Sequence, residues 1–94
     1  MQTVAATQSK LDPNAVRQKI LEIAREFCEK GPGWAQESVV LREVAERLGV
    51  AGDVSLARQQ DILTSWHDLF REGVLSWGYN LDNPNSPCFH FRNP

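Results

Sequence analysis

The chain has 94 residues, in which ten lysines and arginines stand against twelve aspartates and glutamates for a formal net charge of −2. A chain of this length forms one domain with a modest core. Its 41% hydrophobic and 23% charged residues are the composition of an ordinary globular domain, and its charge is not that of a strongly basic nucleic-acid binder. The composition therefore excludes a second domain and a polycationic protein.

The sequence contains no signal that directs the chain to a membrane or to an oxidising compartment. Residues 1–11, MQTVAATQSKL, are predicted to be a flexible tail ahead of a domain at 12–94, and they lack a basic region followed by an apolar run. No uninterrupted apolar stretch of about 18 residues occurs. We therefore expect a cytoplasmic protein without membrane contact, in which Cys28 and Cys88 are free, partly buried thiols.

A first helix is predicted over residues 13–30. Asp12 can cap the free amides of the first turn, and Pro13 is tolerated at the first helical position. Apolar side chains recur at steps of three and four residues, at Val16, Ile20, Ile23, Ala24 and Phe27. The stretch GPG at 31–33 ends the helix, because glycine permits a left-handed C-cap and proline cannot continue the hydrogen-bond ladder. Trp34 is expected to anchor in the core, with ligand stacking as the alternative.

Two further helices are predicted, over residues 38–48 and 56–72. The first carries an apolar face formed by Leu41, Val44, Ala45 and Leu48, and Gly49 supplies its end. The second ends at Gly73, and advancing it by 100° per residue places one apolar stripe at Ile62, Leu63, Trp66, Leu69 and Phe70.

The sequence ends in two short runs, 74–79 and 88–92, that alternate with a period of two and are predicted to pair as a hairpin. Residues 80–86, rich in Asn, Asp, Ser and Pro, form its tip. Pairing the strands creates an apolar underside of Leu75, Trp77, Tyr79, Phe89 and Phe91. The side chains expected to face away from it are Cys88, His90 and Arg92.

Three helices followed by a two-stranded hairpin is the order of winged helix-turn-helix domains. LREVAERLGV at 41–50 resembles the first helix and turn of that family's helix-turn-helix unit, and WHDLFREGVLSWG at 66–78 resembles the end of its recognition helix running into the first wing strand. The resemblance covers residues 13–92 and implies an α+β fold with a C-terminal wing. The stretch 50–73 is longer than a compact member needs, which predicts an extended turn or an early start of the third helix.

This arrangement predicts one core, to which all three helices and the hairpin contribute. The side chains expected to be buried in it are Ile20, Phe27, Leu48, Ile62, Trp66, Leu69, Phe89 and Phe91.

The resemblance implies a contact with double-stranded DNA. In this family the third helix typically enters the major groove while the wing contacts the backbone or the minor groove. Glutamine and threonine can contact bases or phosphates, and arginines can flank them. The candidate DNA-binding residues are Arg42, Arg58, Gln60, Thr64, Asn83 and Arg92.

The third helix also supports an alternative function, a protein-interaction module. Its outward side is expected to carry Asp61 and Asp68 against one base, Arg71, and acids oppose binding to phosphates. These three residues and the wing are the candidate partner-binding surface, since a fold does not by itself determine the partner. A positive stripe joining the candidate arginines would favour DNA, whereas a neutral or acidic face with exposed Trp77 or Tyr79 would favour a protein partner.

Patterns that indicate catalysis are missing from the sequence. It contains no glycine-rich phosphate loop, no paired-histidine metal motif and no serine flanked by glycines at a strand-to-helix turn. The residues that could formally bind zinc lack the close-paired spacing of a zinc site, and they are Cys28, His67, Cys88 and His90. We therefore expect a protein that is not an enzyme and needs no cofactor.

Overall fold

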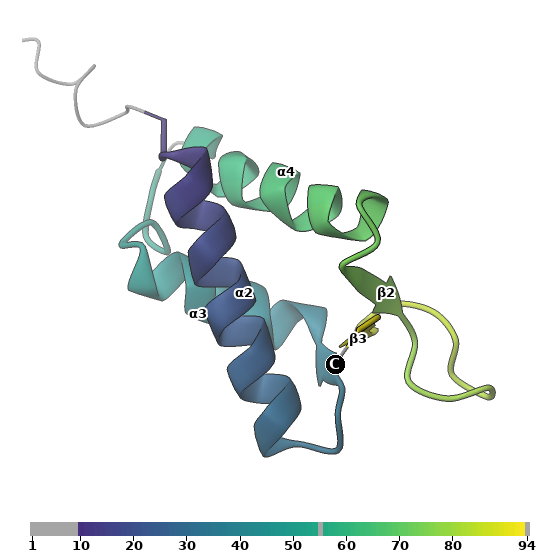
Figure 1. The fold of residues 1–94 in the computed structure, drawn as a ribbon. Helices are drawn as coiled ribbons and strands as arrows, with labels where there is room; N and C mark the ends of the chain where they lie inside the picture. The colour runs from purple at the N-terminus through teal and green to yellow at the C-terminus, as the bar shows by residue number, and fades with distance from the viewer. Residues whose placement is uncertain (1–9, 55, 94) are drawn as a thin grey trace, which may run out of the picture.

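The computed structural model describes residues 10–54 and 56–93, so the predicted tail at 1–11 lies outside the described residues except for its last two positions. Within the described ranges, three helices and a small antiparallel sheet form an α+β fold, as the sequence predicts (Figure 1). The helices are α2 (Pro13–Lys30), α3 (Glu37–Arg47) and α4 (Ala57–Arg71). None of them has the length and apolar character that crossing a membrane requires.

The helix ends show where local sequence signals were right and where they were wrong. The bounds of α2 are those predicted, and α3 and α4 each begin within one residue of the predicted start. Asp12 occupies the N-cap position of α2, but its side chain forms no capping hydrogen bond. Gly31 is the C-cap with a φ of −103°, and the positive φ of 96° falls on Gly33 instead. The left-handed residue therefore lies in the loop after the helix.

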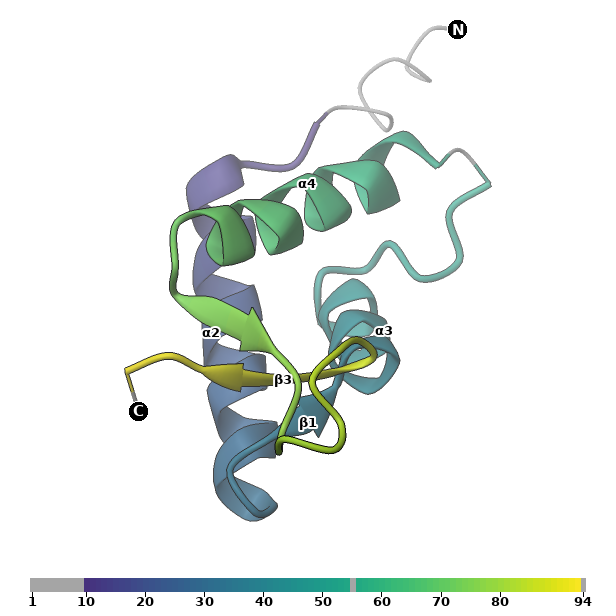
Figure 2. The ribbon, with the colours of Figure 1, turned by 90° about the vertical axis from the view of Figure 1, so that its right-hand side faces the viewer.

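The sheet has one strand more than the predicted two-stranded hairpin. Its strands are β1 (Ala35–Gln36), β2 (Leu75–Trp77) and β3 (Cys88–Phe91), in the antiparallel order β1-β3-β2 (Figure 2). The extra strand, β1, is the short extended segment between α2 and α3. Two residues are too few to show an alternating pattern, so the sequence carried no sign of this strand.

The register of the hairpin confirms the predicted pairing of its two apolar sides. Leu75 lies opposite Phe91, and Trp77 lies opposite Phe89. Cys88, predicted to face away from this apolar side, lies outside the core cluster to which Phe89 and Phe91 belong, yet it is buried next to Gln36 of β1 with only 8% of its surface exposed.

The core lies between the three helices and the sheet, and Trp66 of α4 is at its centre. The Trp66 ring is fully buried and makes edge-on contacts with Phe70 and Phe89, at centroid distances of 5.1 and 4.9 Å. Its indole Nε1 donates a hydrogen bond of 3.0 Å to Oε2 of Glu37, in the first turn of α3. The ring therefore joins α4 both to the sheet and to α3.

Three residues predicted for the core are only partly buried. Phe27 and Leu48 pack against the edge of the core, since Phe27 lies in the last turn of α2 and Leu48 is the C-cap of α3. Trp34 lies outside the core and stacks on Tyr79, with ring centroids 4.3 Å apart and planes 17° from parallel. The aromatic ring after α2 thus supports the loop between β2 and β3.

The connection between α3 and α4 is the extended turn that the length of the sequence predicted. It covers residues 48–56, of which residue 55 lies outside the described ranges. Val50 is fully buried and brings the chain back to the core. Gln59 Nε2 donates a hydrogen bond of 2.9 Å to the Val50 carbonyl, and Arg58 binds Asp53. The first turn of α4 therefore holds the long turn in place.

Candidate nucleic-acid interface

The outward side of α4 carries a continuous row of exposed polar side chains. We define the α4 stripe as Gln60, Thr64, His67 and Arg71, all exposed. They follow one another at steps of three or four residues and so share one side of the helix. No acid interrupts the row.

The two aspartates of α4 lie on the flank that faces α2 and are half-buried. Asp61 Oδ2 accepts a hydrogen bond of 3.3 Å from the backbone N–H of Leu11, just ahead of α2. On the same flank, Glu72 pairs with Arg17 of α2 at 2.9 Å. Asp68 forms an ion pair with Arg71 and so holds one end of the α4 stripe. The acids thus border the stripe.

The candidate arginines do not form one positive stripe. Arg58 donates from Nε and Nη2 to the two carboxylate oxygens of Asp53, both at 2.9 Å, and this hydrogen bonding raises the pKa of Arg58. Arg92 lies at the other end of α4, where its Nη1 would be 2.7 Å from a Cβ added to Gly73. Arg42 is exposed on α3 and makes no ion pair within the described ranges. Each arginine therefore occupies a different part of the domain.

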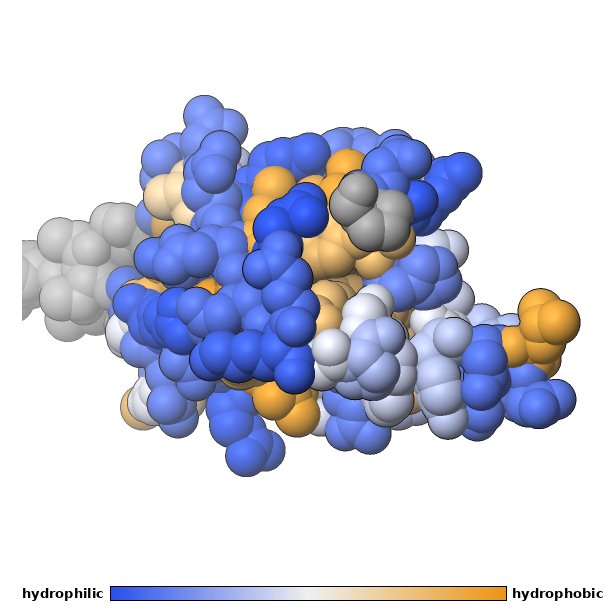
Figure 3. Space-filling view, turned by 60° about the horizontal axis from the view of Figure 1, so that its bottom comes forward, coloured by the Kyte–Doolittle hydropathy of each residue, from blue (hydrophilic) through white to orange (hydrophobic). Residues whose placement is uncertain are grey.

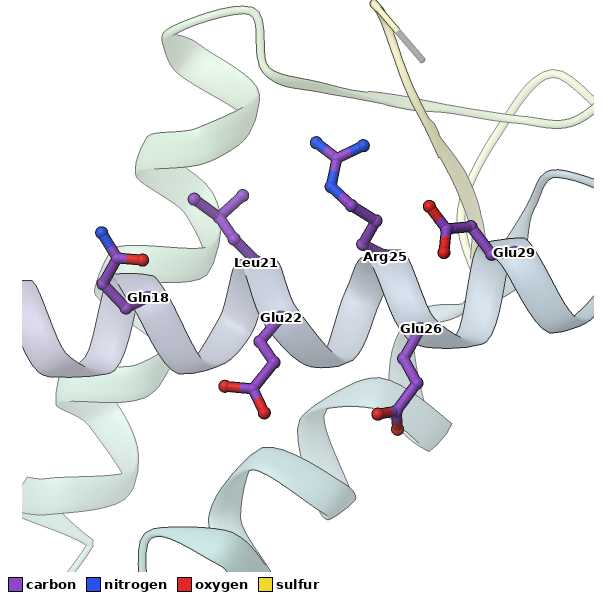
Figure 4. A pocket seen from close by; sticks show the side chains of 6 residues that line it. All are labelled: Gln18, Leu21, Glu22, Arg25, Glu26 and Glu29. Atoms are coloured by element: carbon purple, nitrogen blue, oxygen red, sulfur yellow. The ribbon is translucent and has the colours of Figure 1, made fainter.

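The exposed surface of α2 holds a shallow depression with mainly charged walls. Figure 4 shows Glu22 and Glu26 pointing toward α3, away from Arg25 and Glu29. Both glutamates pair with Arg47 of α3, at 3.6 and 2.9 Å. Hydrogen bonds to Glu43 and Glu26 raise the pKa of Arg47. This network joins α2 to α3 and leaves the Arg47 charge compensated.

The loop between β2 and β3, which lies where the resemblance predicts a wing and is called the wing below, projects from the sheet (Figure 1). Figure 3 shows hydrophilic residues over much of this face, a hydrophobic area in its upper centre, and hydrophobic residues at its right-hand end, which is the side of this loop in Figure 1. Asn83 lies in the tip, where it bonds with Asn80. Arg92 follows β3 and lies at the opposite end of the hairpin. Asn83 and Arg92, both candidate DNA-binding residues, therefore lie at opposite ends of the hairpin.

A groove between α3 and α4 was not predicted from the sequence. It encloses about 290 Å³, and its walls are Leu41, Arg42, Ala45, Ala51, Gln59, Ile62 and Leu63. Five of these side chains are apolar, and Arg42, which is an exposed residue of α3, lines the groove with them. Leu63 was placed on the apolar stripe of α4 and is 40% exposed, so its apolar character was the sequence signal that could have pointed to the groove.

The cysteines are free and buried, as expected, and burial raises the pKa of the Cys28 thiol. His90 Nδ1 lies 2.6 Å from the carbonyl oxygen of Gly78 at the base of the wing. Across residues 10–54 and 56–93, no three His, Cys, Asp or Glu side chains come close enough together to hold a metal ion.

Comparison with protein-family models, with curated proteins and with solved structures finds no match to this chain. The order of helices and strands is compatible with a winged-helix layout. Function is therefore inferred from the geometry of the chain itself.

Proposed function

We propose that this domain is a non-enzymatic module that binds double-stranded DNA through the α4 stripe. The observation that carries the proposal is the composition of the stripe, which is polar, exposed and free of acids. An α-helix fits the width of the DNA major groove. The 15 residues of α4 span about 22 Å, which suffices for a helix that lies in the groove.

The side chains of the α4 stripe have the chemistry that base edges and phosphates require. A glutamine amide can bind adenine with two hydrogen bonds, and a threonine hydroxyl can donate to or accept from several base edges. Arginine binds guanine or a phosphate, and the Arg71 side chain is 76% exposed. We therefore expect Gln60 and Thr64 to determine sequence preference and Arg71 to contribute affinity.

Two cations lie near the C-terminal end of α4. Arg71 is in the last turn of the helix, and the guanidinium of Arg92 lies against Gly73, two residues beyond it. A DNA backbone that passes this end of the helix would meet both charges. Asn83, in the wing, is the proposed second point of contact with the backbone.

A protein partner is the second candidate, and three observations favour it: the candidate arginines form no continuous positive stripe, Tyr79 is 40% exposed, and many of the cations are already paired. Five of the ten lysines and arginines form ion pairs within the described ranges, namely Arg17, Lys19, Arg47, Arg58 and Arg71. Binding to DNA draws much of its affinity from cations that neutralise phosphates, so these pairs limit it. In this alternative, Asp61, Asp68 and Arg71 form the contact surface.

The test is a fluorescence-anisotropy titration with a random-sequence duplex at about 20 mM and about 150 mM salt. We expect binding at the lower salt that weakens at the higher salt. Arg71→Ala and Arg92→Ala should each weaken binding to all sequences and lower the salt slope by about one unit. Gln60→Ala and Thr64→Ala should chiefly change sequence preference, while Asp61→Asn and Asp68→Asn should strengthen binding.

Lys30→Ala is the matched control, because it also removes one positive charge but lies at the end of α2 remote from α4 (Figure 1). It should affect binding less than Arg71→Ala. If the native chain and the double variant Asp61→Asn/Asp68→Asn both fail to bind at the lower salt, the DNA proposal is wrong and the protein-partner candidate takes its place.

A further inference from the structure

The tip of the wing is a rigid turn whose outermost side chain is apolar. The backbone N–H of Asn83 donates to the carbonyl oxygen of Asn80 at 3.1 Å and to its Oδ1 at 2.8 Å. The Asn83 side-chain amide donates to the same Oδ1 at 3.0 Å. Leu81 lies between these residues and is 98% exposed. The turn therefore constrains the backbone that carries Leu81 and leaves the aliphatic side chain exposed.

The base of the wing is held as firmly as its tip. Gly78 has a φ of +94°, and a Cβ added there would lie only 2.6 Å from the Pro84 backbone, so the two halves of the loop are in close contact. The backbone N–H of Gly78 donates to the Cys88 carbonyl, and that of Tyr79 donates to the Asn83 carbonyl. A side chain presented by a preorganised loop loses little conformational entropy when it binds. Leu81 is thus suited to enter a pocket.

The carboxylate of Asp82 indicates that the tip fits a surface that carries a positive charge. Its side chain is exposed beside Leu81 and makes no ion pair within the described ranges. A carboxylate at this position would be repelled by DNA phosphates, which argues against insertion of Leu81 between base pairs. The complementary surface is an apolar pocket with an unpaired cation at its edge.

The chain itself contains such a surface in the groove between α3 and α4. The groove is lined mostly by apolar side chains, and its volume of about 290 Å³ exceeds that of a leucine side chain. Arg42, which also lines the groove, makes no ion pair with any of the residues that the structure describes. The exposure of Leu81 shows that it does not enter the groove of its own chain.

We propose that two copies of this chain associate by inserting Leu81 of each copy into the groove between α3 and α4 of the other. In this dimer the carboxylate of Asp82 pairs with the guanidinium of Arg42 across the interface. A two-fold axis lets both copies make the same contact, which closes the assembly at two chains. The contact is small, so the dimer is weak and depends on concentration. This inference does not rest on the DNA proposal, and it uses the same wing tip, so a copy whose Leu81 fills the other groove does not offer Asn83 to DNA.

The experiment is a dilution series of the ¹⁵N-labelled chain without DNA, from about 1 mM to about 10 µM, with sedimentation measured on the same samples. We expect the sedimenting mass to rise toward that of a dimer with concentration. The amide signals of Leu81, Asp82 and the groove residues should shift in parallel. A native chain that remains monomeric at about 1 mM overturns the proposal.

Leu81→Ala should weaken association at least about tenfold while leaving the thermal melting temperature unchanged, because the side chain has no contacts to lose. Val39→Ala is the matched control. Like Leu81, Val39 is an exposed aliphatic residue, at 50%, but it lies in α3 and does not line the groove. An association that survives Leu81→Ala, or that is equally sensitive to Val39→Ala, overturns the proposal.

Charge reversal tests the ion pair separately. Asp82→Arg alone and Arg42→Asp alone should each weaken association, because each places like charges at both contacts. A one-to-one mixture of the two variants should recover it, since each contact in the mixed dimer then joins opposite charges. Failure of the mixture to associate more strongly than either variant alone overturns the pairing of Asp82 with Arg42.

Discussion

Replacing Trp66 tests the central contact of the fold. Trp66→Ala removes a fully buried ring that touches Phe70, Trp77 and Phe89, and it also removes the hydrogen bond to Glu37. Truncating a large buried aromatic side chain costs about 3–5 kcal/mol of unfolding free energy, because the surrounding structure fills the cavity only in part. A domain of this size has about 5–14 kcal/mol in total, so the loss should be a large fraction of its stability.

A second substitution separates the hydrogen bond from the packing. Trp66→Phe keeps most of the ring but removes the indole N–H, and we expect it to cost about 1–2 kcal/mol because water can replace part of the interaction at the half-buried Glu37. Glu37→Ala should lose the same interaction. A double-mutant cycle between these two changes measures the coupling directly.

The assay is urea unfolding followed by circular dichroism, since tryptophan fluorescence would change with the substitution itself. With a slope of about 1 kcal/mol per molar urea, Trp66→Ala should lower the midpoint by about 3–5 M. A loss below about 1 kcal/mol would refute the placement of Trp66 in the core. A cycle with no coupling energy would refute the hydrogen bond to Glu37.

Two further predictions concern Gly78 and Cys28. Gly78→Ala should destabilise the fold by about 1–3 kcal/mol or more in urea unfolding, because it adds a clash with Pro84 to the strain of a positive φ. A Cβ added at Gly33 would have the same strain of a positive φ but nothing within 4 Å, so Gly33→Ala should cost less unfolding free energy. Equal losses for the two variants would contradict the clash with Pro84. Burial raises the pKa of the Cys28 thiol above its ordinary 9.0, so the folded state holds this proton more tightly. The unfolding free energy that this shift contributes is fully present at pH values below the ordinary pKa. It is lost as the pH rises through the folded-state pKa. Between about pH 8 and pH 10, Cys28→Ala should therefore lose less unfolding free energy than the native chain, and equal losses would contradict the burial effect.

The sequence by itself determined the elements whose signals are local. The bounds of α2 follow from the apolar period of three and four residues and from the proline and glycines at its ends. That the apolar sides of the two runs lie on one face of the sheet follows from their alternation, because a shift by one residue would have turned the apolar side chains of one run to the other face. The long turn before α4 was one of two outcomes expected because residues 50–73 are more than a compact member of the resembled family needs.

Only the tertiary structure decided which side chains are covered and which surfaces remain open. Cys88 alternates like an outward residue, but β1 pairs beside it, and the two residues of β1 show no pattern of their own. Asp61 and Asp68 were expected on the outward side of α4, yet the position of α2 makes that flank half-buried. The groove beside Leu63 exists because of the way α3 and α4 pack together. Burial depends on which segment, far away in the sequence, packs over a residue. The spacing of apolar residues within one helix or strand does not tell which segment that will be.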